Sequence, residues 1–242
     1  MRRRSFVQLA LLAVLVAAAT TAIALLIPWL PQSAGKERDR IDLVFWLATG
    51  IAIAIFAIVV SAILFAVVRF RARPDDDSDG PPIHGHTTLE IVWTAVPTAL
   101  VTAIAALSAV VLHENASAGR DPLRVRVTAV QFAWSFTYLN GPAKGVTTPV
   151  LRLPLRRPVR LEIESKDVIH SFWVPQFGQK QDAVPGRPQT LVITPTKLGT
   201  FPVVCAELCG LGHALMRSQA TVMRPGAFAA WAKTAGQGGA TS

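Results

Sequence analysis

The two cysteines of the chain lie in one short segment together with a histidine and a methionine. Cys205 and Cys209 are separated by three residues. His213 follows Cys209 by four residues, and Met216 comes three residues later. Two thiolates, an imidazole and a thioether within one loop form a ligand set that suits copper. His170 offers a second imidazole just before a proline-containing turn, and a β-sandwich can bring such a turn beside the cysteine loop.

Three other chemistries compete for these residues. A disulfide is the simplest interpretation of two cysteines outside the cytoplasm, but a disulfide requires neither His213 nor Met216. Zinc sites are built from cysteine, histidine and carboxylates rather than thioethers. A single blue copper uses one cysteine with two histidines and a weak axial methionine. The second cysteine favours two metal ions, because two thiolates can bridge a pair of copper ions.

The composition indicates a membrane protein with one modest domain. Of the 242 residues, 51% are hydrophobic and only 16% are charged. Three uncharged stretches before residue 113 each exceed the roughly 20 residues that cross a bilayer as a helix. They show no polar face, which disfavours core helices of a soluble protein.

We interpret residues 1–35 as a signal sequence or a first transmembrane anchor. We favour the retained anchor, because its apolar stretch is longer than a typical signal core of about 7 to 15 residues. Residues 41–70 and 89–113 are predicted to be transmembrane helices.

Basic residues near the ends of these stretches predict which side of the membrane each segment faces. Arg2 to Arg4 precede the first stretch, and three arginines between residues 69 and 73 follow the second. Such clusters mark the cytoplasmic side. Residues 71–88 are therefore predicted to form a cytoplasmic loop, and the chain beyond residue 113 is predicted to lie outside.

The charge of this external part restricts its partners. Residues 113–242 contain 15 Lys and Arg against 7 Asp and Glu. An external domain does not meet the genome, so a nucleic-acid partner is excluded. An acidic protein or anionic lipid headgroups suit such a basic surface.

Short runs rich in valine, threonine and aromatic residues begin at Leu123 and predict an all-β domain. Apolar and polar residues alternate from Leu123 to Thr128, which is the period of a half-buried strand. Several such runs at this spacing predict a Greek-key β-sandwich over residues 120–224. Residues 225–242 are predicted to form a short terminal helix and a flexible tail.

The segment 205–216, together with residues 167–175 upstream, resembles the CuA signature of cytochrome c oxidase subunit II of the bacterial type. The resemblance implies a cupredoxin-like fold and a centre of two copper ions that Cys205 and Cys209 bridge. It also implies a magnesium ion shared with subunit I, to which the Glu207 side chain contributes. The implied copper ligands are His170, Cys205, Glu207 through its backbone carbonyl, Cys209, His213 and Met216.

Two further segments extend the resemblance over about residues 41–233. Residues 84–97 resemble the start of the family's second conserved transmembrane helix, and residues 182–186 resemble a conserved external turn. The resemblance places Glu90 at the mouth of a proton pathway into subunit I. A carboxylate at the edge of an apolar span is usually functional or paired. A solvated interfacial carboxylate or a simple helix N-terminal charge explains Glu90 equally well.

The aromatic run of the family is altered in this chain. The usual Gln-Trp-Tyr-Trp is replaced by residues 131–134, with Phe132 where electrons enter in the family. Phenylalanine still packs against a haem edge but lacks the indole N–H. We therefore assign electron acceptance to Phe132 and Trp134, with core aromatic residues of a strand as the alternative interpretation.

The function that the resemblance implies is electron transfer in a proton-pumping terminal oxidase of the bacterial plasma membrane. A c-type cytochrome supplies electrons, which pass to haem in subunit I for reduction of oxygen to water; subunit III is a further partner. Residues 138–159 are poor in acids, so the cytochrome is expected to be acidic or tethered. A CuA subunit of a nitric oxide reductase is the main alternative. A quinol oxidase subunit should lack the copper ligands, and a thioredoxin-like copper chaperone should alternate helices with strands.

Overall fold

The computed structural model describes residues 3–71, 82 and 84–238 and divides the chain into two compact units. One unit contains Met1–Leu30 and Leu43–Ser108, and the other contains Pro31–Asp42 and Ala109–Ser242. The predicted cytoplasmic loop, residues 71–88, and the predicted flexible tail fall largely outside the described residues. Each unit is described by itself below.

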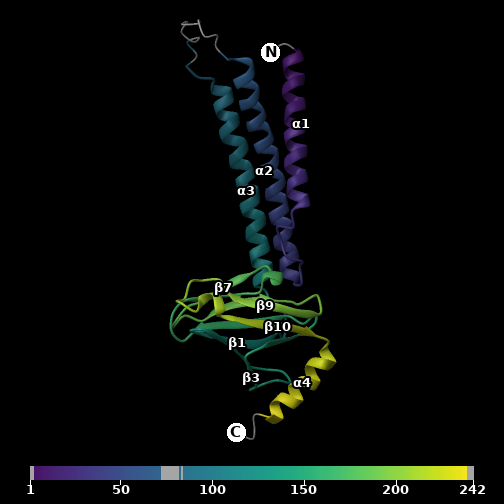
Figure 1. Cartoon of the computed structure of the whole chain (residues 1–242), viewed down its shortest axis with the longest axis vertical. Coiled ribbons are helices and arrows are strands. Elements are labelled where there is room, and N and C mark those ends of the chain that lie inside the picture. Colours follow the sequence, from purple (N-terminus) through teal and green to yellow (C-terminus); the bar gives the residue numbers. More distant parts are fainter. Residues whose placement is uncertain (1–2, 72–81, 83, 239–242) are drawn as a thin grey trace. The chain divides into compact units, whose positions relative to one another are not determined.

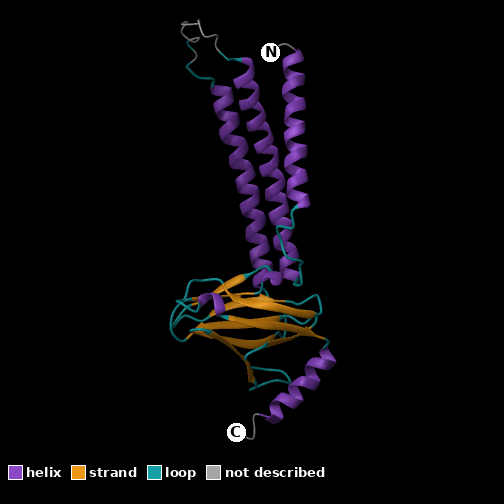
Figure 2. Cartoon of the chain, in the orientation of Figure 1, coloured by secondary structure: helices purple, strands orange, loops and turns teal. Residues whose placement is uncertain are grey.

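The first unit is built from long apolar helices, drawn in purple in Figure 2. The helices α1 (Arg3–Leu26), α2 (Lys36–Arg69) and α3 (Thr87–Ala116) contain 24, 34 and 30 residues. All three are long and apolar enough to cross a bilayer. Large apolar side chains are exposed along all three helices, as expected for helices that are solvated by lipid.

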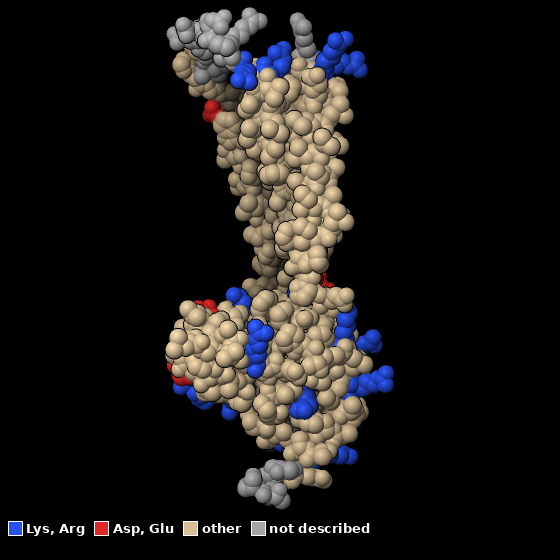
Figure 3. All heavy atoms as spheres, viewed as in Figure 1, with Lys and Arg blue, Asp and Glu red and all other residues tan. Residues whose placement is uncertain are grey.

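Positive charge gathers at one end of the helical unit. Figure 3 shows blue side chains gathered at the end of the helical unit where α1 begins and α2 ends, whereas the visible long sides are mostly tan. Arg3 and Arg4 lie at the start of α1, and Arg69 lies at the end of α2. The chain therefore brings these arginines to the same end of the unit, as the sequence pattern predicts.

The second unit is a β-sandwich of two five-stranded sheets, seen as stacked orange layers in Figure 2. The first sheet has the order β3-β2-β1-β5-β8 and the second has the order β4-β10-β9-β6-β7. The strands are β1 (Leu123–Val130), β2 (Ala133–Tyr138), β3 (Thr147–Thr148), β4 (Leu151–Pro154), β5 (Val159–Ser165), β6 (His170–Trp173), β7 (Lys180–Ala183), β8 (Gln189–Ile193), β9 (Gly199–Cys205) and β10 (Arg217–Met223).

The alternation of residue types produces the core of this sandwich. Leu123, Val125 and Val127 of β1 are fully buried, and the arginines between them are exposed. The same alternation continues through β2, where Phe136 and Tyr138 are fully buried. The apolar faces of both sheets therefore meet in one core, and the predicted all-β fold class is confirmed.

Residues 123–138 form two strands rather than one. β1 and β2 pair antiparallel, with Val130 opposite Ala133, so Gln131 and Phe132 form the turn between them. No glycine or proline marks this turn in the sequence. Alternation alone cannot locate a turn without such a residue, because both strands keep the same period.

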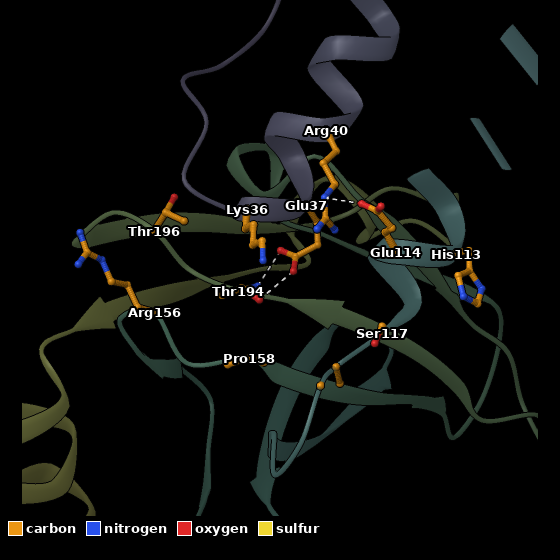
Figure 4. Close-up of a pocket in the computed structure, with 12 residues that line it drawn as sticks. Lys36, Glu37, Arg40, His113, Glu114, Ser117, Arg156, Pro158, Thr194 and Thr196 are labelled. Atoms are coloured by element: carbon orange, nitrogen blue, oxygen red, sulfur yellow. Dashed lines mark hydrogen bonds and ion pairs between the residues drawn. The ribbon is translucent and has the colours of Figure 1, made fainter. Parts of the chain in front are cut away.

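The segment Pro31–Asp42 belongs to the β-sandwich unit, although it precedes the sandwich by about 80 residues in the sequence. Gly35 forms a β-bridge with Pro195. The carboxylate of Glu37 accepts hydrogen bonds from the backbone N–H and the hydroxyl of Thr194, both at 2.8 Å, as Figure 4 shows. These contacts join the start of α2 to the end of β8.

A buried arginine secures the same segment. Arg38 is 5% exposed, forms an ion pair with Asp42 and donates a hydrogen bond to the carbonyl of Pro175 at 2.7 Å. Pro175 opens a short 3₁₀ helix, η1 (Pro175–Phe177), which directly follows β6. Arg38 therefore contacts the segment that leaves the strand beginning with His170.

The last described element is α4 (Pro225–Gly238), which follows β10 in Figure 1. Phe228 of α4 is buried, and Trp231 packs beside Tyr138 of β2 with ring centroids 5.3 Å apart. Arg152 of β4 lies over the ring of Trp231 at 5.0 Å from its centroid. The terminal helix is therefore packed onto the sandwich through aromatic contacts.

Candidate metal centre

The pairing of two strands brings the predicted ligands together. His170 opens β6 and Cys205 closes β9. These strands are antiparallel neighbours, with Phe172 opposite Cys205. Cys209 and Met216 lie on the connection from β9 to β10, which folds back over the end of the sheet. The site therefore depends on one strand pair and one loop.

The sulfur and nitrogen atoms of the predicted ligands face one another. Cys205 Sγ lies 3.8 Å from Cys209 Sγ and 3.9 Å from His170 Nδ1. Cys209 Sγ lies 3.6 Å from His213 Nδ1 and 3.8 Å from Met216 Sδ. Each of the five predicted side-chain ligands thus lies within 4 Å of another, and Cys205 and Cys209 link the rest.

Both cysteines are free thiols. Their sulfur separation is far longer than the roughly 2.05 Å of a disulfide bond, so the disulfide alternative does not describe this structure. Two ligands held about 2.0 to 2.3 Å from one ion at a tetrahedral angle stand roughly 3.3 to 3.8 Å apart. The observed separations, 3.6 to 3.9 Å, lie in the upper half of this range or just above it.

The donor set fits copper. Cys205, Cys209 and His170 form a buried cluster whose ligand atoms lie within 4.8 Å of one another. Met216 is fully buried and directs its thioether at the same cluster, and thioether with thiolate suits copper better than zinc. The backbone carbonyl of Glu207 lies 3.2 Å from Cys205 Sγ, whereas the Glu207 side chain is exposed.

Burial changes the acidity of one thiol. Burial, together with the neighbouring Cys205, raises the pKa of Cys209 to about 11. The thiol of the metal-free chain is therefore protonated at neutral pH. A metal ion must displace this proton, because thiolates rather than thiols are the ligands.

A carboxylate orients the buried histidine. His170 is fully buried and its Nε2 lies 2.8 Å from Asp167 Oδ1, which leaves Nδ1 directed at Cys205. Burial opposes ionisation of Asp167, but hydrogen bonds from His170 and from the backbone of Gln131 and Val168 lower its pKa to about 2. Such a partner for the second ring nitrogen is typical of metal-binding histidines.

The two predicted electron-accepting aromatic residues differ in position. Phe132 is 38% exposed and its ring lies against the backbone of Gly212, next to His213. Trp134 is buried and packs edge-on against His170, with ring centroids 6.2 Å apart. Phe132 is thus a surface residue beside the loop of predicted ligands, and Trp134 is a core residue beside the predicted ligand His170.

Glu90 lies in the helical unit at the start of α3. Its carboxylate accepts a hydrogen bond from the backbone N–H of His86 at 3.2 Å, and His86 Nδ1 accepts one from Leu89 N–H. This reciprocal arrangement resembles a capping box. The contacts account for Glu90 as a helix N-terminal residue, and the proton-path role stays a prediction.

A separate pocket of about 770 Å³ lies in the sandwich unit, lined by charged residues at the start of α2 and the end of α3. Figure 4 shows Arg40 facing Glu114, at a distance of 3.1 Å, and Glu37 facing Thr194. The carboxylates of Glu37 and Glu114 in the pocket wall therefore already have partners, Thr194 and Arg40. This pocket contains no cysteine and lies outside the metal cluster.

Sequence reasoning missed one group of contacts around the centre. The side-chain amide of Gln131 donates a hydrogen bond to the carbonyl of Cys209 at 2.7 Å. These residues are 78 positions apart, and no pattern in the sequence connects them. Only the folded turn between β1 and β2 brings them together.

Fold and site together define a class of protein. A β-sandwich that holds two thiols, two imidazoles and a thioether at one end of a sheet, in a chain with helices of membrane-spanning length, has the copper site of a membrane-anchored protein. The described part of its β-unit consists of two strand-built sheets, which excludes the thioredoxin-like chaperone.

Comparisons with known proteins agree with this class. A family model described as cytochrome c oxidase subunit II, periplasmic domain, matches residues 143–222, and the corresponding transmembrane-domain model matches residues 10–111. Cytochrome c oxidase subunit 2 of Synechocystis sp. is 34% identical over 249 residues, covering 84% of this chain and 74% of the relative. Cytochrome c oxidase subunit 2 of Thermostichus vulcanus is also 34% identical, over 255 residues that cover 84% of this chain and 77% of the relative.

Among solved structures, the periplasmic domain of subunit II of the cytochrome oxidase of Bradyrhizobium japonicum is 29% identical, with a TM-score of 0.47. The superposed residues cover 50% of this chain and 98% of that domain. The relatives and the family models show that this chain belongs to the cytochrome c oxidase subunit II family. The predicted family, the membrane anchoring and the role of an electron-transferring oxidase subunit are thereby confirmed.

Proposed function

We propose that this chain accepts electrons from a c-type cytochrome at a two-copper CuA centre and passes them to haem in subunit I. Oxygen is reduced to water in subunit I, and protons are pumped. One observation carries the proposal: two free thiols lie side by side, with two imidazoles and a thioether next to them and neighbouring ligand atoms 3.6 to 3.9 Å apart.

Five side chains and one backbone carbonyl would bind the metal. Cys205, Cys209, His170, His213 and Met216 would hold the copper ions through their side chains. The backbone carbonyl of Glu207 completes the copper ligands. When bound, the copper pair supplies a site that takes up and gives up one electron at a time. The buried strand pair keeps the ligands in place, which limits their rearrangement when the charge of the site changes.

Three further roles complete the proposal. Phe132 and Trp134 accept the electrons, Phe132 at the surface and Trp134 in the core beside His170. The exposed side chain of Glu207 contributes to a magnesium ion that is shared with subunit I. Glu90 stands at the mouth of a proton pathway into subunit I.

The proposed setting is the bacterial plasma membrane, with the β-sandwich unit on its outer side. The gathering of arginines at one end of the helical unit supports this orientation, because basic residues stay in the cytoplasm. Subunits I and III are the proposed membrane partners.

The proposed electron donor is acidic or tethered to the complex. Residues 113–242 carry a formal charge of 15 − 7 = +8, which would repel a strongly basic cytochrome. Electrostatic complementarity acts mainly on association rates and is weakened by salt.

Stopped-flow reduction of the purified, copper-loaded chain tests this function. A reduced acidic c-type cytochrome and a reduced basic one are compared at low and high ionic strength, with Cys209→Ser as the control that lacks one of the thiol ligands. We expect faster reduction by the acidic cytochrome at low salt and no reduction of the variant. Equal reduction of the variant, or no electron uptake by the wild-type chain, would contradict the proposal.

A further inference from the structure

The turn between β1 and β2 contacts two elements that carry ligands. The backbone N–H of Gln131 donates a hydrogen bond to Asp167 Oδ2 at 2.6 Å. Its side-chain amide donates to the carbonyl of Cys209 at 2.7 Å. Gln131 thus touches the segment before β6 with its backbone and the cysteine loop with its side chain.

Asp167 continues this connection to a ligand. Its second oxygen, Oδ1, lies 2.8 Å from His170 Nε2 and also accepts a hydrogen bond from the backbone N–H of Val168 at 2.7 Å. A continuous path therefore runs from His170 through Asp167 and Gln131 to Cys209. Its two ends are ligands on different elements, β6 and the loop between β9 and β10.

The next residue of the turn presses on the same loop. A Cβ placed on Gly212 would lie 2.5 Å from a ring carbon of Phe132, and one placed on Gly210 would lie 3.3 Å from the same ring. The ring therefore rests on the loop backbone between two ligands. The turn therefore contacts the loop at two points, through the amide of Gln131 and the ring of Phe132.

We propose that Gln131 is a positioning residue of the metal centre. It fixes the loop that carries Cys209 relative to the imidazole of His170, although it donates no atom to the metal. The inference rests on the proposed copper function and deepens it. The amide acts on the position of a ligand's backbone, so it affects how firmly the centre holds its metal and how the two ions share an electron.

Gln131→Met tests this role in the full-length, copper-loaded chain. Methionine keeps the length of the side chain and the backbone bond to Asp167, and removes only the amide bond to Cys209. Gln179→Met is the matched control, because Gln179 also donates its side-chain amide to a backbone carbonyl, that of Val192 in β8, at 3.0 Å. β8 contributes no ligand.

Three quantities are measured for each variant: the rate of copper release to a chelator, the copper hyperfine pattern, and the melting temperature of the metal-free chain. We expect Gln131→Met to weaken copper binding by about 10-fold and to alter the hyperfine pattern, because such supporting contacts typically contribute 10- to 100-fold to metal affinity. Gln179→Met should release copper at the wild-type rate. Without metal, the two variants should have the same melting temperature.

Other results would overturn the inference. Wild-type release and an unchanged hyperfine pattern in Gln131→Met would show that the amide positions nothing. Equal losses in both methionine variants would indicate a general loss of stability instead. Gln131→Glu, which places a carboxylate against the Cys209 carbonyl, should release copper faster than Gln131→Met. A wild-type chain that takes up no copper would overturn the proposed function as well, and this outcome is recognised before any variant is compared.

Discussion

Replacing Gly212 with alanine would move the Phe132 ring without changing any copper ligand. The new Cβ would lie 2.5, 2.6 and 2.8 Å from three ring carbons. Ordinary carbon contacts are about 3.5 to 4.0 Å, so the ring must retreat by roughly 1 Å. Gly212 has φ −89°, which alanine adopts freely, and the partly exposed ring has solvent to move into.

The electron-transfer rate should fall because the ring loses contact with the loop beside His213. A misplacement of 1 Å at a reacting site can cost up to about 100-fold in rate, and we take this as the upper bound for the slower reduction of Gly212→Ala by its cytochrome. Stopped-flow absorbance at saturating cytochrome measures this rate. Copper content and the copper spectrum should remain those of the wild-type chain.

A double-mutant comparison identifies the ring as the cause. Phe132→Ala should itself slow reduction, and adding Gly212→Ala to it should have no further effect, because the clash is absent. A wild-type rate in Gly212→Ala with intact copper would refute the assignment of electron acceptance to Phe132. An undiminished effect of Gly212→Ala in the Phe132→Ala background would show that the loop, rather than the ring, is responsible.

Three more predictions concern stability and metal uptake. Tyr138→Phe should lower the free energy of unfolding by about 2 kcal/mol in urea denaturation. The buried hydroxyl donates a hydrogen bond to the carbonyl of Arg152 in β4 and accepts one from its N–H, so its removal leaves both backbone groups unpaired. Gly178→Ala should lower the melting temperature, since Gly178 has φ +77° and an added Cβ would collide with Arg38; an unchanged value would contradict the packing described here. Copper uptake at pH 7 should release protons, and copper affinity should rise with pH, because burial and Cys205 raise the pKa of Cys209 to about 11; proton release in a weakly buffered titration measures this.

Residue type and period were sufficient for the parts of the fold that form local patterns. The alternation from Leu123 onward predicted β1, and the long apolar stretches predicted α2 and α3. β6 escaped prediction because it spans only four residues, of which three are buried in succession, and therefore shows no alternation. The ligands were recognisable because their types are rare in this chain and closely spaced.

Contacts between distant segments could not be predicted in the same way. The segment Pro31–Asp42 joins the sandwich unit through Glu37 and Arg38, and the predicted domain of residues 120–224 does not include it. Charged residues beside an apolar stretch are usually solvated, and nothing local distinguishes a buried arginine from an exposed one. Experiments on the metal centre are therefore best made on the full-length chain.

Copper stoichiometry combined with electron paramagnetic resonance of the full-length chain tests the central claim most directly. The account predicts two copper ions per chain and a hyperfine pattern in which one unpaired electron couples equally to two copper nuclei. Coupling to a single copper nucleus, or a chain whose cysteines oxidise to a disulfide and bind no copper, would contradict it.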